Sequence, residues 1–139
     1  MTTLPLTAAP AAGMTPAKIA ILVGYGVVLW AIGVVLLRLV ASAAWFGSPL
    51  HPLLYVLIIP GTWPCIRYGP AVAGLPRRET LRAATIASMT ALLIDGIIIG
   101  FVPDLYASDP ATARACAGAL LWGVGVALIL GLIMQPRGD

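Results

Sequence analysis

The chain has 139 residues, of which 60% are hydrophobic and only 9% are charged. An ordinary soluble domain has about 45–50% apolar and about 25% charged residues, whereas the mean hydropathy here is +1.01. This composition excludes a soluble enzyme, a disordered regulator and a disulfide scaffold, and it predicts an all-α integral membrane protein. The net charge of +3 is spread over the ends of apolar segments, which favours a role in membrane orientation over nucleic-acid binding.

Residues 1–17 are rich in Pro, Ala and Thr, and they predict a disordered N-terminal tail. Met14 is an alternative native start to Met1. A bilayer core about 30 Å thick needs about 20 apolar residues per helix. The rest of the chain therefore predicts one four-helix transmembrane domain, residues 18–135, as an up-down bundle with spans at 19–45, 50–68, 81–102 and 112–134, followed by a short tail at 136–139.

The first span ends near Ala41-Ser42-Ala43, which resembles a signal-peptidase site. Its apolar run is longer than the apolar region of a signal peptide, which favours a retained helix. The second span contains a predicted helix break at Pro60, Gly61 and Pro64. Pro60 has no N–H to donate to the Val56 carbonyl. Because a freed carbonyl in lipid needs another partner, we expect this irregular face to point into protein or water.

The distribution of basic residues predicts the orientation in the membrane. Six lie on the side that holds both termini and two on the other side; they are Lys18, Arg67, Arg77, Arg78, Arg82 and Arg137 against Arg38 and Arg114. The positive-inside rule then places both termini in the cytoplasm and the chain in the inner (plasma) membrane. Cys65 and Cys116 lie near opposite ends of their spans, too far apart for a disulfide.

Asp95 is the most informative residue, because it is a carboxylic acid in the apolar run MTALLIDGIIIGF. Counting from Arg82 places it about 20 Å from the inner surface. A carboxylate at such depth costs about 2.5–3.5 kcal/mol unless it is paired or protonated. Three interpretations stay open: a structural charge pair, a transport or ligand site, and a neutral hydrogen-bonded acid.

Arg38 is the expected ion partner of Asp95, since both lie about 11–12 Å from the outer ends of their spans. The alternative is that Arg38 extends to the outer headgroups. Trp30 and Trp122 are predicted at the same depth as Asp95, which indicates either core packing or an aromatic cavity for a cationic or lipid-like ligand.

Small residues recur every four positions and predict close helix packing. The two stripes are Ala115, Ala119, Gly123, Ala127 and Gly131 in the fourth span, and Ala83, Ala87 and Ala91 in the third. We expect these stripes to pack against each other, with composition alone as the alternative explanation. His51 is the only histidine, so no metal-ligand set and no Ser–His–Asp set is predicted. No catalytic residue and no cofactor is expected.

Three segments carry a resemblance to a protein family. They are PRRETLRAATIASMTALLIDGIIIGF, GALLWGVGVALILGL and, in the first span, VVLWAIGVVLLRL. The chain resembles an uncharacterised family, a domain of unknown function, of small four-span bacterial membrane proteins. The positions that carry it are Arg38, Asp95 and Leu121-Trp122-Gly123, whereas the tail and the proline-rich second span are outside the pattern. The resemblance implies architecture and no activity.

The sequence leaves three functional hypotheses open. The first is a non-enzymatic accessory or structural membrane protein, acting alone, as a homo-oligomer or with a larger membrane partner. The second is a small oligomeric proton-coupled transporter that uses Asp95. The third is a membrane enzyme acting on lipids or quinones.

Overall fold

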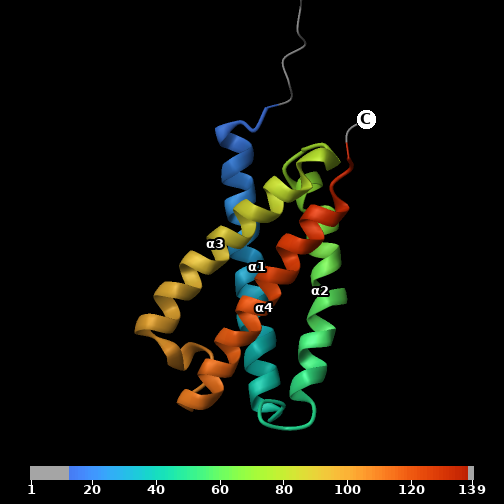
Figure 1. Cartoon of the computed structure of the whole chain (residues 1–139). Helices are drawn as coiled ribbons and strands as arrows, with labels where there is room; N and C mark the ends of the chain where they lie inside the picture. Colours follow the sequence, from blue (N-terminus) through green and yellow to red (C-terminus); the bar gives the residue numbers. More distant parts are fainter. Residues whose placement is uncertain (1–12, 138–139) are drawn as a thin grey trace, which may run out of the picture.

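The computed structural model describes residues 13–137, and every regular element in this part of the chain is helical. Four α-helices run along the molecule (Figure 1), with short 3-10 turns before and after the third helix. They are α1 (Pro16–Ser42), α2 (His51–Val72), η1 (Arg77–Glu79), α3 (Thr80–Phe101), η2 (Pro103–Leu105) and α4 (Pro110–Met134). Three segments are long and apolar enough to cross a membrane, namely Pro16–Ser42, Arg77–Phe101 and Pro110–Met134. The all-α membrane prediction is thereby confirmed.

Local capping explains where α1 and α4 begin. Thr15 caps α1, since its hydroxyl accepts a hydrogen bond from the Lys18 amide, and Pro16 suits the first helical turn. The predicted disordered tail is therefore too long at its C-terminal end, while its first twelve residues lie outside the described part of the chain. Asp109 caps α4 in the same way through the Thr112 amide.

The second helix differs from its prediction in two respects. α2 is continuous from His51 to Val72, with its prolines inside the helix rather than at a break. Pro60, Gly61 and Pro64 are all exposed, so the proline-altered face points outward instead of into the bundle. At about 1.5 Å per residue α2 is about 33 Å long. Its length matches the other helices, and its prolines and polar residues set it apart from the three long apolar helices.

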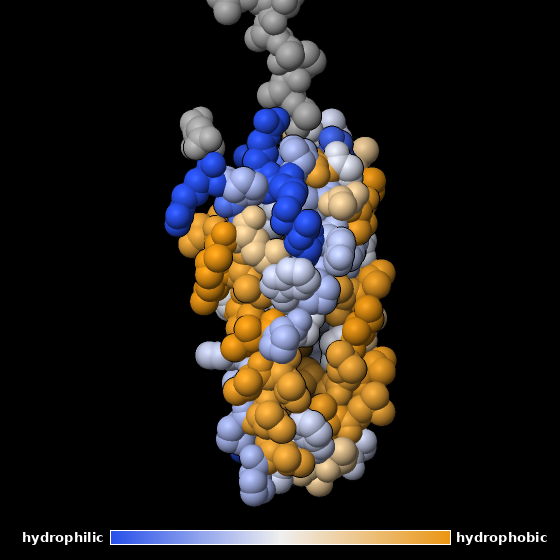
Figure 2. All heavy atoms as spheres, turned by 90° about the vertical axis from the view of Figure 1, so that its right-hand side faces the viewer, coloured by the Kyte–Doolittle hydropathy of each residue, from blue (hydrophilic) through white to orange (hydrophobic). Residues whose placement is uncertain are grey.

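Both described ends of the chain lie at one end of the bundle (Figure 1). Two contacts fix this arrangement: the Lys18 ammonium donates to the Gly74 carbonyl, and the Leu81 amide donates to the Gln135 side chain. Figure 2 shows strongly hydrophilic groups gathered at this end and apolar groups below it. The α1–α2 and α3–α4 connections lie at the opposite end.

The two small-residue stripes lie at different interfaces. The α3 stripe faces α1, because Ala83 packs with Leu22 and a Cβ at Gly26 would stand 2.7 Å from the Ala87 carbonyl oxygen. The α4 stripe packs elsewhere, with Gly131 against Ala84 of α3. α3 and α4 pack against each other as expected, but the α4 stripe meets Ala84, beside the α3 stripe, rather than the α3 stripe itself. α1 and α3 run in the same direction, and their close approach leads along both helices to Asp95.

Candidate functional site

A polar cluster lies inside the otherwise apolar bundle, at Asp95. The Trp30 indole N–H of α1 donates to Asp95 Oδ1 over 2.8 Å. The Tyr106 hydroxyl, from the connection between α3 and α4, donates to the same oxygen. Trp30 Nε1 also lies 3.2 Å from the Tyr106 oxygen, so the three side chains form a closed triangle. The cluster joins α1, α3 and the α3–α4 connection at one point.

The cluster is well shielded from the surroundings of the bundle. Asp95 is 4% exposed and Tyr106 is 2% exposed. Tyr106 packs with Val34, Leu37 and Cys116 in the largest apolar cluster of residues 13–137. A buried carboxylate without partners is costly, and two donors on one oxygen offset part of that cost. The arrangement can hold helices in register, or it can hold a proton at the second carboxylate oxygen.

Trp30 is the one predicted neighbour that contacts Asp95, and the two side chains lie at the same level of the bundle. Repeats of four residues explain this placement, since Leu22, Gly26 and Trp30 lie on one face of α1, along the stripe of α3 that ends at Asp95. The close approach at Gly26 brings the two backbones together. The indole can therefore reach across the interface.

The predicted ion pair between Arg38 and Asp95 is not formed. Arg38 Nη1 donates to the Leu105 carbonyl over 2.9 Å, and the one ion pair among residues 13–137 joins Arg82 to Glu79. The physical reason is depth: Trp30 already lies level with Asp95, and Arg38 is two helical turns farther along α1, about 12 Å. Arg38 instead holds the residue next to Tyr106.

Trp122 lies in a different part of the bundle from Asp95. Its indole N–H donates to the Tyr55 carbonyl of α2 over 3.0 Å, and its ring packs at 5.7 Å from the Tyr55 ring. Tyr55 in turn packs against His51, whose Nε2 is buried without a partner in the described chain. The predicted aromatic cavity with both tryptophans beside Asp95 is therefore not formed.

Tyr106 is the member of the cluster that the sequence did not reveal. It follows Pro103, just past the end of the predicted third span, and residues in such a connection have no periodicity that indicates a buried face. The signal that would have found it is chemical: a buried acid needs donors, and a tyrosine eleven residues from Asp95, just past a sharp turn, can reach back to it.

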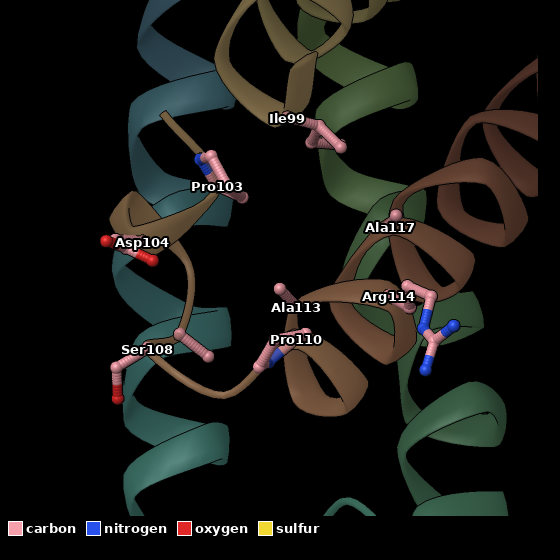
Figure 3. A pocket seen from close by; sticks show the side chains of 9 residues that line it. Ile99, Pro103, Asp104, Ser108, Pro110, Ala113, Arg114 and Ala117 are labelled. Carbon is pink, nitrogen blue, oxygen red and sulfur yellow. The ribbon is translucent and has the colours of Figure 1, made fainter. Parts of the chain in front are cut away.

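A pocket of about 330 Å³ opens at the end of the bundle that holds the α3–α4 connection. Figure 3 shows it between the connection and the start of α4, with Pro103 and Ser108 on one side and Ala113 and Ala117 on the other. Asp104 and Arg114 also line it. Asp95 lies in neither this pocket nor the smaller hollow beside α2.

Comparisons with known proteins supply no family. No family model matches the chain, and neither the curated proteins nor the solved structures gave a match. The resemblance to small four-span bacterial membrane proteins therefore stays a prediction. Within residues 13–137, Cys65 and Cys116 are free thiols and no group of three metal-ligating side chains occurs.

Proposed function

We propose that this protein is a small four-span membrane protein with a structural or accessory role, in which the Asp95 cluster locks the bundle. The observation that carries this is the closed triangle of Asp95, Trp30 and Tyr106. Donors from this same chain occupy one carboxylate oxygen, and the acid lines neither pocket. A substrate site needs a route from outside, whereas a packing lock needs only partners within the chain.

Four spans and cytoplasmic termini are part of this proposal. α2 is long enough to cross a bilayer and has a row of exposed apolar side chains, among them Leu53, Val56 and Leu57. Both described chain ends lie at the strongly hydrophilic end of the bundle (Figures 1 and 2), which holds Lys18 at the start of α1 and Arg77, Arg78 and Arg82 at the start of α3. The positive-inside rule places that end in the cytoplasm, and the inner membrane of a bacterium is the proposed location.

A second candidate function rests on one observation at the same acid. No donor within residues 13–137 reaches Asp95 Oδ2, while both donors share Oδ1. A carboxylate with one free oxygen deep in a membrane is the group that proton-coupled transporters use. The alternative is therefore a small oligomeric carrier in which Oδ2 takes up a proton.

One experiment separates the two candidates. The purified full chain is reconstituted in liposomes, and uptake of a cationic dye is followed under an imposed pH gradient, with Asp95→Asn as the matched variant. The structural role predicts dye movement equal to that of empty liposomes for both proteins, together with a lower melting temperature for Asp95→Asn. Uptake by the wild type that disappears in Asp95→Asn would establish the carrier instead.

A further inference from the structure

The outward face of α2 carries backbone oxygens that lack their helical donors. Pro60 cannot donate to the Val56 carbonyl, and Pro64 cannot donate to the Pro60 carbonyl. Neither oxygen receives a side-chain hydrogen bond from residues 13–137, although the nearby Thr62 hydroxyl donates to Ile58. Two other carbonyls of α2 accept side-chain hydrogen bonds from neighbouring helices, Tyr55 from Trp122 and Cys65 from Tyr25.

This face is open to its surroundings in the single chain. Val56 is 60% exposed and Trp63 is 48% exposed, and a Cβ at Gly61 would meet nothing within 4 Å. A hollow of about 290 Å³ lies here, lined by Ile59, Pro60, Trp63 and Leu130. Figure 2 views this side of the molecule, where pale groups of intermediate hydropathy run between orange apolar groups.

Lipid cannot complete this face. Pro60 lies nine residues from one end of α2 and twelve from the other, which places its carbonyl near the middle of the bilayer at about 1.5 Å per residue. Acyl chains at that depth carry no hydrogen-bond donor, and an unsatisfied backbone group in hydrocarbon costs several kcal/mol by general principle. The occupant must therefore bring an N–H or O–H group.

We infer that the occupant is a second copy of this chain, packed two-fold symmetrically with α2 against α2. The Trp63 indole N–H is a donor on the same face, without a partner in the described residues, unlike the indoles of Trp30 and Trp122. The Pro60 carbonyl points along the helix toward Pro64, so it lies nearly level with Trp63, whose side chain leans back toward the helix N-terminus.

Two copies with parallel α2 helices then exchange hydrogen bonds, each Trp63 donating to the Pro60 carbonyl of the other. A two-fold axis along the membrane normal makes the contact self-complementary. The exposed Gly61 permits close approach of the two backbones, and the hollow beside Trp63 accepts apolar side chains of the second copy. This inference rests on the proposed four spans, because it requires α2 to lie in lipid.

The test uses single cysteines in the full chain, in native membranes, with Cys65→Ser and Cys116→Ser as background. Gly61→Cys is compared with Val28→Cys, which lies at a similar depth on exposed α1. Oxidation should cross-link Gly61→Cys into dimers and leave Val28→Cys monomeric. Equal cross-linking at both positions, or none at position 61, would overturn the dimer.

A membrane-impermeant maleimide distinguishes the two possible failures. If Gly61→Cys is labelled in intact membranes, α2 is not in lipid and the four-span proposal fails. If it is protected and still does not cross-link, only the dimer fails. Protection with cross-linking supports both.

Fluorescence energy transfer between labelled copies in liposomes measures the dimer dissociation constant, and variants then show how much the hydrogen bonds contribute to it. Membrane hydrogen bonds of this kind average about 0.6 kcal/mol, so losing two should raise the dimer dissociation constant about fivefold to tenfold. Trp63→Phe should produce this change, and Pro64→Ala should also weaken the dimer by restoring a helical donor to the Pro60 carbonyl. Pro52→Ala, at the first turn of α2, is the control. A dissociation constant unchanged in Trp63→Phe would contradict the exchange of hydrogen bonds.

Discussion

The α1–α3 interface and the outward face of α2 both hold polar groups, but the chain supplies side-chain donors only to the polar group at the first. Burial of the Asp95 carboxylate is costly, and one of its two oxygens accepts hydrogen bonds from Trp30 and Tyr106 of the same chain. Each carbonyl of α2 that loses its helical donor to a proline costs less free energy than a buried carboxylate. No side chain among residues 13–137 donates to the outward carbonyls of Val56 and Pro60. The comparison teaches that the chain supplies donors to its buried acid, whereas, under the four-span proposal, the open carbonyls of α2 are left for a contact with another chain.

The largest effect is expected from removing both donors of Asp95. A Trp30→Phe and Tyr106→Phe double variant keeps an aromatic ring at each position but leaves the acid buried without donors. Each lost donor should cost about 1–3 kcal/mol in the free energy of unfolding, because the acceptor stays desolvated. Denaturation in detergent micelles, followed by circular dichroism, measures the loss.

A rescue variant tests whether the lost donors act through the acid. Adding Asp95→Leu to the double variant removes the uncompensated group, so about half or more of the lost stability should return. If the triple variant is less stable than the double variant, the cluster does not stabilise the bundle in the way proposed.

The second prediction concerns the close approach that brings Trp30 to Asp95. A Cβ at Gly26 would stand 2.7 Å from the Ala87 carbonyl oxygen, and this oxygen belongs to the backbone and cannot turn away. Gly26→Ala should therefore cost about 1–3 kcal/mol through overpacking.

Gly24→Ala is the matched control for Gly26→Ala. It lies in the same helix, and a Cβ there meets nothing within 4 Å. This change should be neutral or stabilise the helix by up to about 1 kcal/mol, because alanine favours helix over glycine. Equal effects of the two changes would show that α1 and α3 do not approach closely at Gly26.

The sequence was sufficient for the level of Trp30 along the bundle and insufficient for the direction in which a side chain points around it. Apolar runs and charges predicted the helices, and counting residues predicted that Trp30 and Asp95 share a layer. The same counting put Trp122 in that layer, but its side chain faces α2, because depth does not specify which neighbour a helix face meets. The small-residue stripes show the same limit: their inward faces were predictable, and their partners were not.

Two other members of the site depended on features that no pattern in a single sequence displays. Tyr106 turns inward because η2 brings the chain back over the end of α3. Arg38 was matched to Asp95 by distance from the outer ends of their spans. α1 extends farther than α3 at this end of the bundle, so equal distances from the two helix ends do not give equal levels. The size of this offset depends on helix length and tilt, which composition does not specify.

The third prediction separates the observed role of Arg38 from the expected ion pair. Arg38→Leu removes the hydrogen bond to the Leu105 carbonyl, which lies at an exposed position, and should cost about 1 kcal/mol. Adding Asp95→Leu should not recover this loss, since the two side chains are not paired. Recovery of stability in that double variant, measured by the same unfolding assay, would instead establish the ion pair.

The smallest effect is expected outside the bundle core, at the start of α4. Hydrogen bonds from the Thr112 amide and hydroxyl lower the pKa of Asp109 below its ordinary value. A carboxylate with a lowered folded-state pKa stabilises the fold above its ordinary pKa, and that contribution is lost as the pH falls through the lowered pKa. The NMR resonance of the Thr112 amide should therefore shift in an acid titration of the wild type, with a midpoint below the ordinary aspartate pKa.

Asp109→Asn is the control, because it keeps a capping oxygen and carries no charge. Its Thr112 resonance should stay constant over the same pH range. A shift of equal size in Asp109→Asn would assign the titration to another group.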